Sequence, residues 1–214
     1  MTLAGRLHGS LRSVLVHGVV LGVALAASGA APWVAPAHAS AREDGSACAH
    51  VDHEFRPTTL AVDGLVEPTR VLALGQDRHG VPKPPPLTER GKWQFAWDKA
   101  VGVSPGGSSG VVRLTAHTYP RAGSRPPALG NLLLDRLRVG AVLEVSGASG
   151  ERLCYRVTRR QQVRASGSLS GYYDTTGPSR LAILVCSGVR RGPGDWSHRT
   201  IWYAEPARPG SEGA

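Results

Sequence analysis

The chain has 214 residues and 41% of them are hydrophobic, which suffices for one ordinary domain with a substantial core. Its formal net charge of +9 is compatible with an anionic partner such as nucleic acid, lipid or an acidic polymer. The basic residues are scattered in short pairs such as Arg159-Arg160 and Arg190-Arg191, with few aromatic residues between them. We therefore expect no nucleic-acid binding.

The first 39 residues have the pattern of a targeting segment. Arg6 and Arg12 precede Val14–Ala31, which is almost entirely apolar or small, and Ala37-His38-Ala39 then offers a signal-peptidase cleavage site. We expect residues 1–39 to direct export of the chain. They serve either as a cleaved signal peptide or as a retained membrane anchor, because the apolar stretch is just long enough to span a bilayer.

Residues 40–57 are polar and irregular, which predicts a flexible tether ahead of a domain over 58–206 and a C-terminal tail over 207–214. From Thr58 onward, short β-rich runs alternate with turn residues. We expect strands at Thr59–Val62, Arg70–Leu74, Gly110–Ala116, Ala141–Ser146, Arg152–Val163, Leu181–Cys186 and Thr200–Ala204. Leu129–Leu137 has leucines at the spacing of a short amphipathic helix. This pattern predicts a mainly β protein, either a closed barrel or a sandwich.

Three segments between these elements are expected to be loops or turns. Gly75 and Gly80, followed by the cluster Pro82–Pro86, predict a long loop that cannot be helical. Ser104–Gly107 contains a proline and two glycines and predicts another turn. Ser146–Glu151 is glycine-rich and predicts the turn of a hairpin.

The chain has three cysteines, Cys48, Cys154 and Cys186, and an odd number in an exported protein leaves at least one thiol outside any internal disulfide. Cys186 ends the apolar run Leu181–Cys186 and is followed by Ser187-Gly188, so we expect its thiol where a buried strand turns toward solvent. A thiol in that position can attack a substrate. A buried structural cysteine would show the same pattern.

His117 and Arg199 also stand at the ends of expected strands. His117 follows Val111–Ala116, and Arg199 opens the final strand Thr200–Ala204. A side chain at a strand end is held by a rigid sheet and is well placed for catalysis. Taken singly, His117 is better explained as an ordinary surface or core residue, and Arg199 as a solvated arginine.

Taken together, these three residues resemble the site of the sortase family of cysteine transpeptidases. In that family too, a histidine at a strand end precedes a cysteine that ends an apolar strand, and an arginine then leads the last strand. The resemblance covers roughly residues 58–206, and the layout is most similar to the actinobacterial class F and class E enzymes. Val185 and Ala182 stand where sortases usually carry threonines.

The resemblance implies a closed sortase-type β-barrel of about eight strands with one or two short helices. It implies that Cys186 attacks the Thr–Gly bond of a Leu-Pro-x-Thr-Gly-like sorting signal on a surface protein, while His117 protonates the leaving amine. Arg199 would donate hydrogen bonds to the substrate backbone or to the oxyanion. An amine of a cell-wall precursor or a pilin lysine would then resolve the thioacyl-enzyme at the cell surface. The reaction needs no metal or organic cofactor.

Two alternatives stay open beside this reading. The altered residues before Cys186 also fit a catalytically impaired module of the same fold that binds or supports other molecules at the cell surface. Another cell-wall cysteine enzyme, such as an L,D-transpeptidase or a papain-like peptidase, is a third reading, but those enzymes carry a different motif around the cysteine.

Cys48 and Cys154 are expected to form a disulfide in an oxidising compartment, which leaves Cys186 as the free thiol. Two free thiols, or intermolecular pairing through Cys48, are the alternatives. The run Cys48–Glu54 also crowds a cysteine, two histidines and two acids into one short segment. Because structural zinc sites usually draw ligand pairs from separated segments, we expect no metal there.

Overall fold

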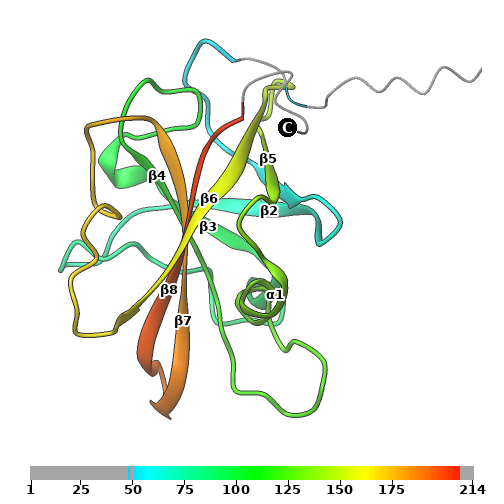
Figure 1. The fold of residues 1–214 in the computed structure, drawn as a ribbon, viewed down its shortest axis with the longest axis vertical. Helices are drawn as coiled ribbons and strands as arrows, with labels where there is room; N and C mark the ends of the chain where they lie inside the picture. Colours follow the sequence, from blue (N-terminus) through cyan, green and yellow to red (C-terminus); the bar gives the residue numbers. More distant parts are fainter. Residues whose placement is uncertain (1–47, 49–50, 208–214) are drawn as a thin grey trace, which may run out of the picture. The chain divides into compact units, whose positions relative to one another are not determined.

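The strands of the chain close into a barrel in the computed structural model, which describes residue 48 and residues 51–207 (Figure 1). Neighbouring strands follow the order β1-β2-β3-β4-β7-β8-β6-β5, and β5 pairs again with β1. The strands are β1 (Thr59–Val62), β2 (Val66–Leu74), β3 (Phe95–Asp98), β4 (Val111–Ala116), β5 (Val142–Ser146), β6 (Arg152–Arg164), β7 (Arg180–Gly192) and β8 (Asp195–Pro206). The prediction of a mainly β, closed barrel of about eight strands is confirmed.

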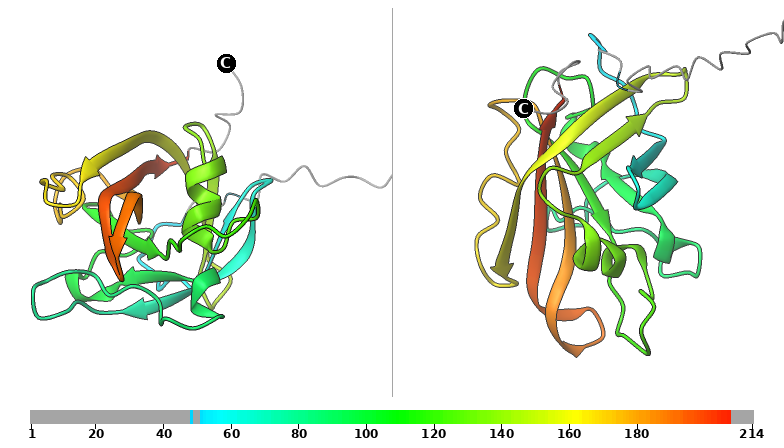
Figure 2. Two further views of the ribbon diagram at one scale, coloured as in Figure 1. Left: turned by 90° about the horizontal axis from the view of Figure 1, so that it is seen from below. Right: turned by 45° about the vertical axis from the view of Figure 1, so that its right-hand side comes forward.

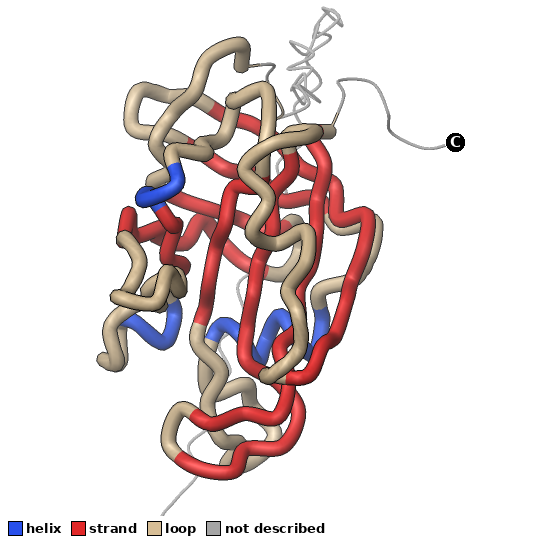
Figure 3. Tube along the Cα trace, turned by 90° about the vertical axis from the view of Figure 1, so that its left-hand side faces the viewer, coloured by secondary structure: helices blue, strands red, loops and turns tan. Residues whose placement is uncertain are grey.

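Helices are short and few in the described chain (Figure 3). The α-helix α1 (Leu129–Arg136) corresponds to the segment predicted from its leucine spacing, and two single 3-10 turns are η1 (Gly91–Trp93) and η2 (Lys99–Val101). Leu129 and Leu133 of α1 are buried in the main core of the barrel. None of the helices within residues 51–207 is long and apolar enough to cross a membrane.

The strands bury alternate side chains because successive residues of a β-strand point to opposite faces. In β7, Leu181, Ile183 and Val185 belong to the core inside the barrel, together with Trp202 of β8. The opposite, outer face of the same strands carries a second, smaller core. It consists of Val111, Tyr172, Ala182, Ile201 and Tyr203, in which Tyr172 comes from the loop between β6 and β7.

Three expectations about strands need correction. β3 was not expected at all, because its four residues are all buried and therefore show no alternation of apolar and polar residues. β7 does not end at Cys186 but continues to Gly192, and β8 begins at Asp195 rather than near Arg199. The two strands stay paired along this polar extension, with register shifts after Ser187. The pairing explains why these segments form strands although their sequences lack a strand pattern.

The extension makes β7 and β8 a long hairpin that projects past the rest of the barrel. Figure 2 shows this hairpin, in orange and red, at the same end as the green segment that leads from β4 to α1. Gly188, at the first register shift, has a φ of 77°. This left-handed conformation suits glycine and lets the strand bulge.

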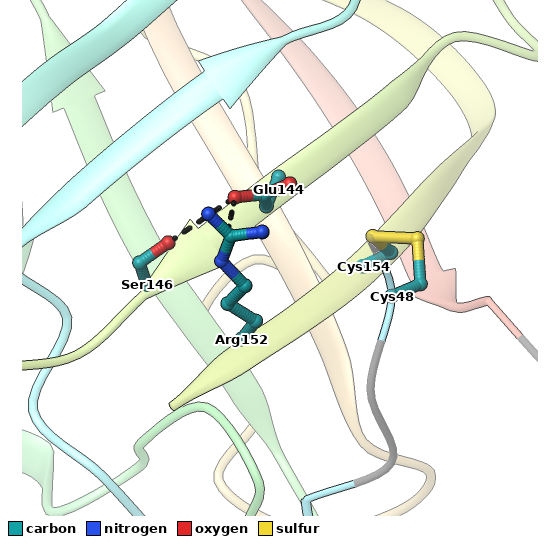
Figure 4. Close-up of a disulfide and its surroundings, with 5 residues drawn as sticks. All are labelled: Cys48, Glu144, Ser146, Arg152 and Cys154. Carbon is teal, nitrogen blue, oxygen red and sulfur yellow. Dashed lines mark hydrogen bonds and ion pairs between the residues drawn. A yellow bond between two sulfur atoms is a disulfide. The ribbon is translucent and has the colours of Figure 1, made fainter. Parts of the chain in front are cut away.

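The segment before β1 lies against the barrel. Phe55 is 5% exposed and belongs to the main core, although it falls within the expected tether over 40–57. The Phe55 amide donates a hydrogen bond of 3.0 Å to the Pro105 carbonyl. Cys48 forms a disulfide with Cys154 of β6, with the two Cα atoms 5.1 Å apart (Figure 4). Cys48 is therefore not a free thiolate that could bind a metal.

Candidate active site

His117, Cys186 and Arg199 lie side by side on three adjacent strands. β4 and β7 are parallel with Ala116 opposite Val185, so that His117, the next residue, comes beside Cys186. β7 and β8 are antiparallel, and Cys186 is directly opposite Arg199. Because Val185 faces the interior, Cys186 and its neighbours lie on the outer face of the barrel. We call this line of three residues the reactive row.

Cys186 is the free cysteine of the chain and is half-buried. Burial raises the pKa of its thiol above the ordinary value, and the nearby positive charge of Arg199 partly opposes that rise. The hydroxyl of Thr118 donates a hydrogen bond of 2.7 Å to the Cys186 carbonyl, which joins the end of β4 to the thiol-bearing residue. The thiol is therefore protonated at neutral pH and needs a base to become a nucleophile.

His117 is held by the long loop between β2 and β3. Its Nε2 lies 2.6 Å from the Pro85 carbonyl oxygen, and because a carbonyl can only accept, Nε2 must carry the hydrogen. In the neutral ring, Nδ1 is then an acceptor. Within residues 51–207 no hydrogen bond joins the imidazole to the Cys186 thiol, so the strand register alone brings the two residues together.

Arg199 points part of its guanidinium group back to its own strand. Its Nη1 donates to the carbonyls of Trp196 at 3.1 Å and His198 at 2.9 Å. These two bonds fix the side chain. Nε and Nη2 have no hydrogen-bond partner in the described part of the chain, which leaves donors for a substrate oxygen.

The first turn of α1 fixes the backbone around His117. The amide of Gly130 donates to the His117 carbonyl at 2.8 Å. The Asn131 side chain accepts from the Tyr119 amide at 2.9 Å and donates to the Tyr119 carbonyl at 3.0 Å. A Cβ on Gly130 would lie 2.4 Å from the His117 carbonyl oxygen, so only glycine permits this approach.

The sequence did not indicate Pro85, Thr118, Gly130 or Asn131 as parts of the site. Pro85 belongs to the predicted long loop, and the proline cluster gave no sign that a carbonyl would reach His117. Gly130 and Asn131 could have been noticed, because a glycine and an asparagine interrupt the leucines at the start of the helix.

A cavity of about 350 Å³ lies between the β7–β8 hairpin and the segment after β4, and none of the three row residues lines it. Thr118 and Tyr119 line it from the segment after β4, and Ser187, Arg190 and Trp196 line it from the β7–β8 hairpin. Thr118 and Ser187 follow His117 and Cys186 in sequence, so their side chains point to the opposite face of the strands. Another cavity of about 330 Å³ lies beside the disulfide, and it too is lined by none of the three row residues.

Comparison with known proteins finds similarity to solved structures only. The chain matches no protein-family model, and no curated protein matches it. Sortase C1 of Streptococcus agalactiae in complex with MTSET is similar at 18% identity, over 72% of this chain and 69% of that one, with a TM-score of 0.49. Sortase C1 of Streptococcus suis is similar at 17% identity, over 76% and 78% of the two chains, with a TM-score of 0.49.

A third similar structure is sortase C2 of Group B Streptococcus Pilus Island 1, at 21% identity over 73% of this chain and 76% of that one, with a TM-score of 0.48. At such identities and TM-scores these are resemblances in the course of the backbone.

Proposed function

We propose that this chain is an exported sortase-type cysteine transpeptidase acting at the cell surface, with Cys186 as nucleophile, His117 as general acid and base, and Arg199 as oxyanion donor. The observation that carries the proposal is the reactive row, in which three adjacent strands bring these residues together on one face. Its layout among sortases is most similar to the actinobacterial class F and class E enzymes.

In the first half of the reaction, the thiol proton passes to Nδ1 of His117 and the thiolate attacks the threonine carbonyl of a Leu-Pro-x-Thr-Gly-like sorting signal. The free donors of Arg199 stabilise the negative charge on the tetrahedral oxygen. The C–N bond to glycine then breaks, and His117 returns the proton to the departing amine. A thioester between threonine and Cys186 remains.

In the second half, an amine of a cell-wall precursor or a pilin lysine attacks the thioester. His117 takes the proton of that amine, a new amide bond forms, and Cys186 leaves as the thiolate. Export of the enzyme would depend on residues 1–39, acting either as a cleaved signal peptide or as a membrane anchor. These residues lie outside the described part of the chain.

A second candidate is a catalytically impaired module with the same barrel. Val185 and Ala182, which stand where sortases usually carry threonines, favour this candidate. So does the thiol of Cys186, because burial raises its pKa and no hydrogen bond joins it to His117 in the described chain. The two candidates differ in one observable property, which is whether Cys186 forms a thioester with a sorting peptide.

The test incubates the full chain in detergent with a panel of Leu-x-x-Thr-Gly peptides and an amine. We expect an acyl adduct on Cys186 by mass spectrometry and an amide product, both lost in Cys186→Ala. His117→Ala should lower the rate about 10²- to 10⁴-fold, as for the loss of a general acid and base. If Cys186 is alkylated by iodoacetamide but no peptide is processed, the impaired module is the correct reading.

A further inference from the structure

The second half of β6 has a free edge. β5 pairs with β6 only over Arg152–Arg156, whereas β8 pairs with it as far as Arg164. Val157 still forms backbone hydrogen bonds with the segment just before β5. After it, Thr158–Val163 make no backbone hydrogen bond on the β5 side within the described chain. An edge of this kind offers unpaired amides and carbonyls to a further strand.

Arginines line this free edge on both faces of the strand. Arg160 is opposite Trp202, which belongs to the core inside the barrel, so Arg160 lies on the inner face. Arg159 therefore points to the outer face, opposite Tyr203. Arg164 follows Arg160 by four positions and returns to the inner face. All three arginines are exposed.

The charges of these arginines are not neutralised by an acid within the described residues. None of the three forms an ion pair there, whereas Arg152, at the start of the same strand, pairs with a glutamate of β5 at 3.5 Å. The guanidinium groups of Arg159 and Arg160 instead rest over the rings of Tyr203 and Trp202, at 4.2 and 5.6 Å from the ring centroids. This stacking holds both groups at the edge and leaves their N–H donors for an outside acceptor.

The charge of the edge decides which strand can be added to it. A second copy of the chain does not fit, because pairing two β6 edges would set one arginine-rich strand against another, and like charges on opposed residues destabilise a sheet. An extended segment with acidic side chains does fit, because opposite charges on opposed residues stabilise the pairing. The edge therefore excludes self-association and favours an acidic partner.

We propose that the free edge of β6 binds an acidic, extended segment of another protein as an added antiparallel strand. In antiparallel pairing, the residues opposite Arg164, Arg160 and Arg159 are the first, fifth and sixth of that segment. Acids at these positions meet an arginine on the correct face, two on the inner face and one on the outer face. Main-chain hydrogen bonds supply the affinity, and the three charge pairs select the partner. This binding does not depend on the proposed transpeptidase function.

The test titrates the full chain in detergent with the fluorescent peptide Glu-Val-Thr-Val-Glu-Glu-Thr and follows its anisotropy. We expect saturable binding and slower hydrogen exchange within Thr158–Arg164 when the peptide is bound. Arg159→Glu with Arg160→Glu should weaken binding about tenfold or more, because two attractive pairs become repulsive. A peptide with lysines at its fifth and sixth positions should bind this variant and not the wild type, which also shows that the variant is folded.

Arg70→Glu is the matched control, because Arg70 is an exposed arginine of β2 that is already paired with β1. It should leave the affinity unchanged. A second control peptide, Glu-Thr-Val-Glu-Val-Thr-Glu, has the same composition, but no register sets more than one of its acids opposite an arginine, so it should bind more weakly. Equal binding of the two peptides, no binding, or binding without slower exchange in β6 would overturn the inference. So would protection of the same amides by dimerisation of the free chain, which would make a second copy the occupant.

Discussion

Cys186 stands under two opposing influences, and their balance sets the resting state of its thiol. Burial disfavours the thiolate and raises the pKa, whereas the positive charge of Arg199 favours the thiolate and lowers it. Burial is the larger effect. The thiol of the free protein is therefore neutral at rest, and in the proposed reaction the thiolate forms only when His117 takes its proton in the substrate-bound state.

This balance predicts the pH dependence of thiol alkylation. Because the pKa of Cys186 is raised, the thiolate and hence the alkylation rate should increase at higher pH than for the same cysteine in the denatured chain. Arg199→Ala removes the opposing charge and should shift the profile further toward alkaline pH. Rates of iodoacetamide labelling against pH would measure both shifts.

Arg191→Ala is the matched control for that profile, because Arg191 is an exposed arginine of the same hairpin that pairs with Asp195 at 3.1 Å. It should leave the profile of Cys186 unchanged. A native thiol that titrates at or below the pH of the denatured one would contradict the resting state described above, as would an Arg199→Ala profile that does not move.

At the scale of elements, the start of α1 acts as a support for the end of β4. Gly130 contacts the His117 carbonyl, and Asn131 holds the backbone of Tyr119 at both its amide and its carbonyl. β4 ends at Ala116, so the residues after it have no strand partners on this side. The helix replaces those partners and fixes the histidine beside the thiol.

Gly130→Ala should therefore impair catalysis more than it impairs folding. Its Cβ would lie 2.4 Å from the His117 carbonyl oxygen and must push β4 and α1 apart. Overpacking of this kind costs about 1–3 kcal/mol of unfolding free energy. We expect peptide turnover to fall at least about tenfold, because small displacements of catalytic groups are costly. Urea denaturation and steady-state kinetics would measure the two effects.

The control for Gly130→Ala is Gly192→Ala, since a Cβ on Gly192 would meet no atom within 4 Å. Gly192→Ala should change neither stability nor turnover. If Gly130→Ala turned over peptide at the wild-type rate, α1 would not be what positions His117.

The fold class and most strands could be predicted because their residues alternate or form apolar runs of the right length. β3 could not, since all four of its residues are buried and the segment is very short. The outer parts of β7 and β8 are polar and rich in arginine and glycine. They form strands because each pairs with the other, which is a tertiary property that no local pattern contains.

The candidate site was predictable only in its strand-end residues. His117, Cys186 and Arg199 stand out by their order along the chain. Pro85 does not, because its carbonyl reaches His117 only once the barrel has closed. A proline carbonyl has no sequence signature of its own.

At the scale of the whole molecule, one covalent link ties the amino-terminal segment to the barrel. Cys48 and Cys154 are separated by 106 positions, and the bond joins the segment before β1 to the start of β6, whose far end pairs with Arg199. Phe55 adds a non-covalent attachment in the same segment. The disulfide therefore encloses β1 to β5, including the strand that carries His117.

Replacing both cysteines, Cys48→Ser with Cys154→Ser, should lower the free energy of unfolding by about 2–4 kcal/mol, because the unfolded chain regains the freedom of a long loop. Urea denaturation of the double variant would measure the loss. Cys186→Ser is the control and should leave stability nearly unchanged. A double variant as stable as the wild type would mean that the link constrains nothing in the unfolded chain.

The same disulfide has a consequence for oxidation chemistry. It uses two of the three cysteines, so Cys186 has no second thiol in its own chain. A cysteine oxidised to the sulfenic acid is normally rescued when a neighbouring thiol condenses with it. Cys186 lacks that route, and its recovery after peroxide exposure has to come from a small thiol or a reductase outside the molecule. The bond that steadies the barrel thus leaves its reactive sulfur dependent on its surroundings for repair.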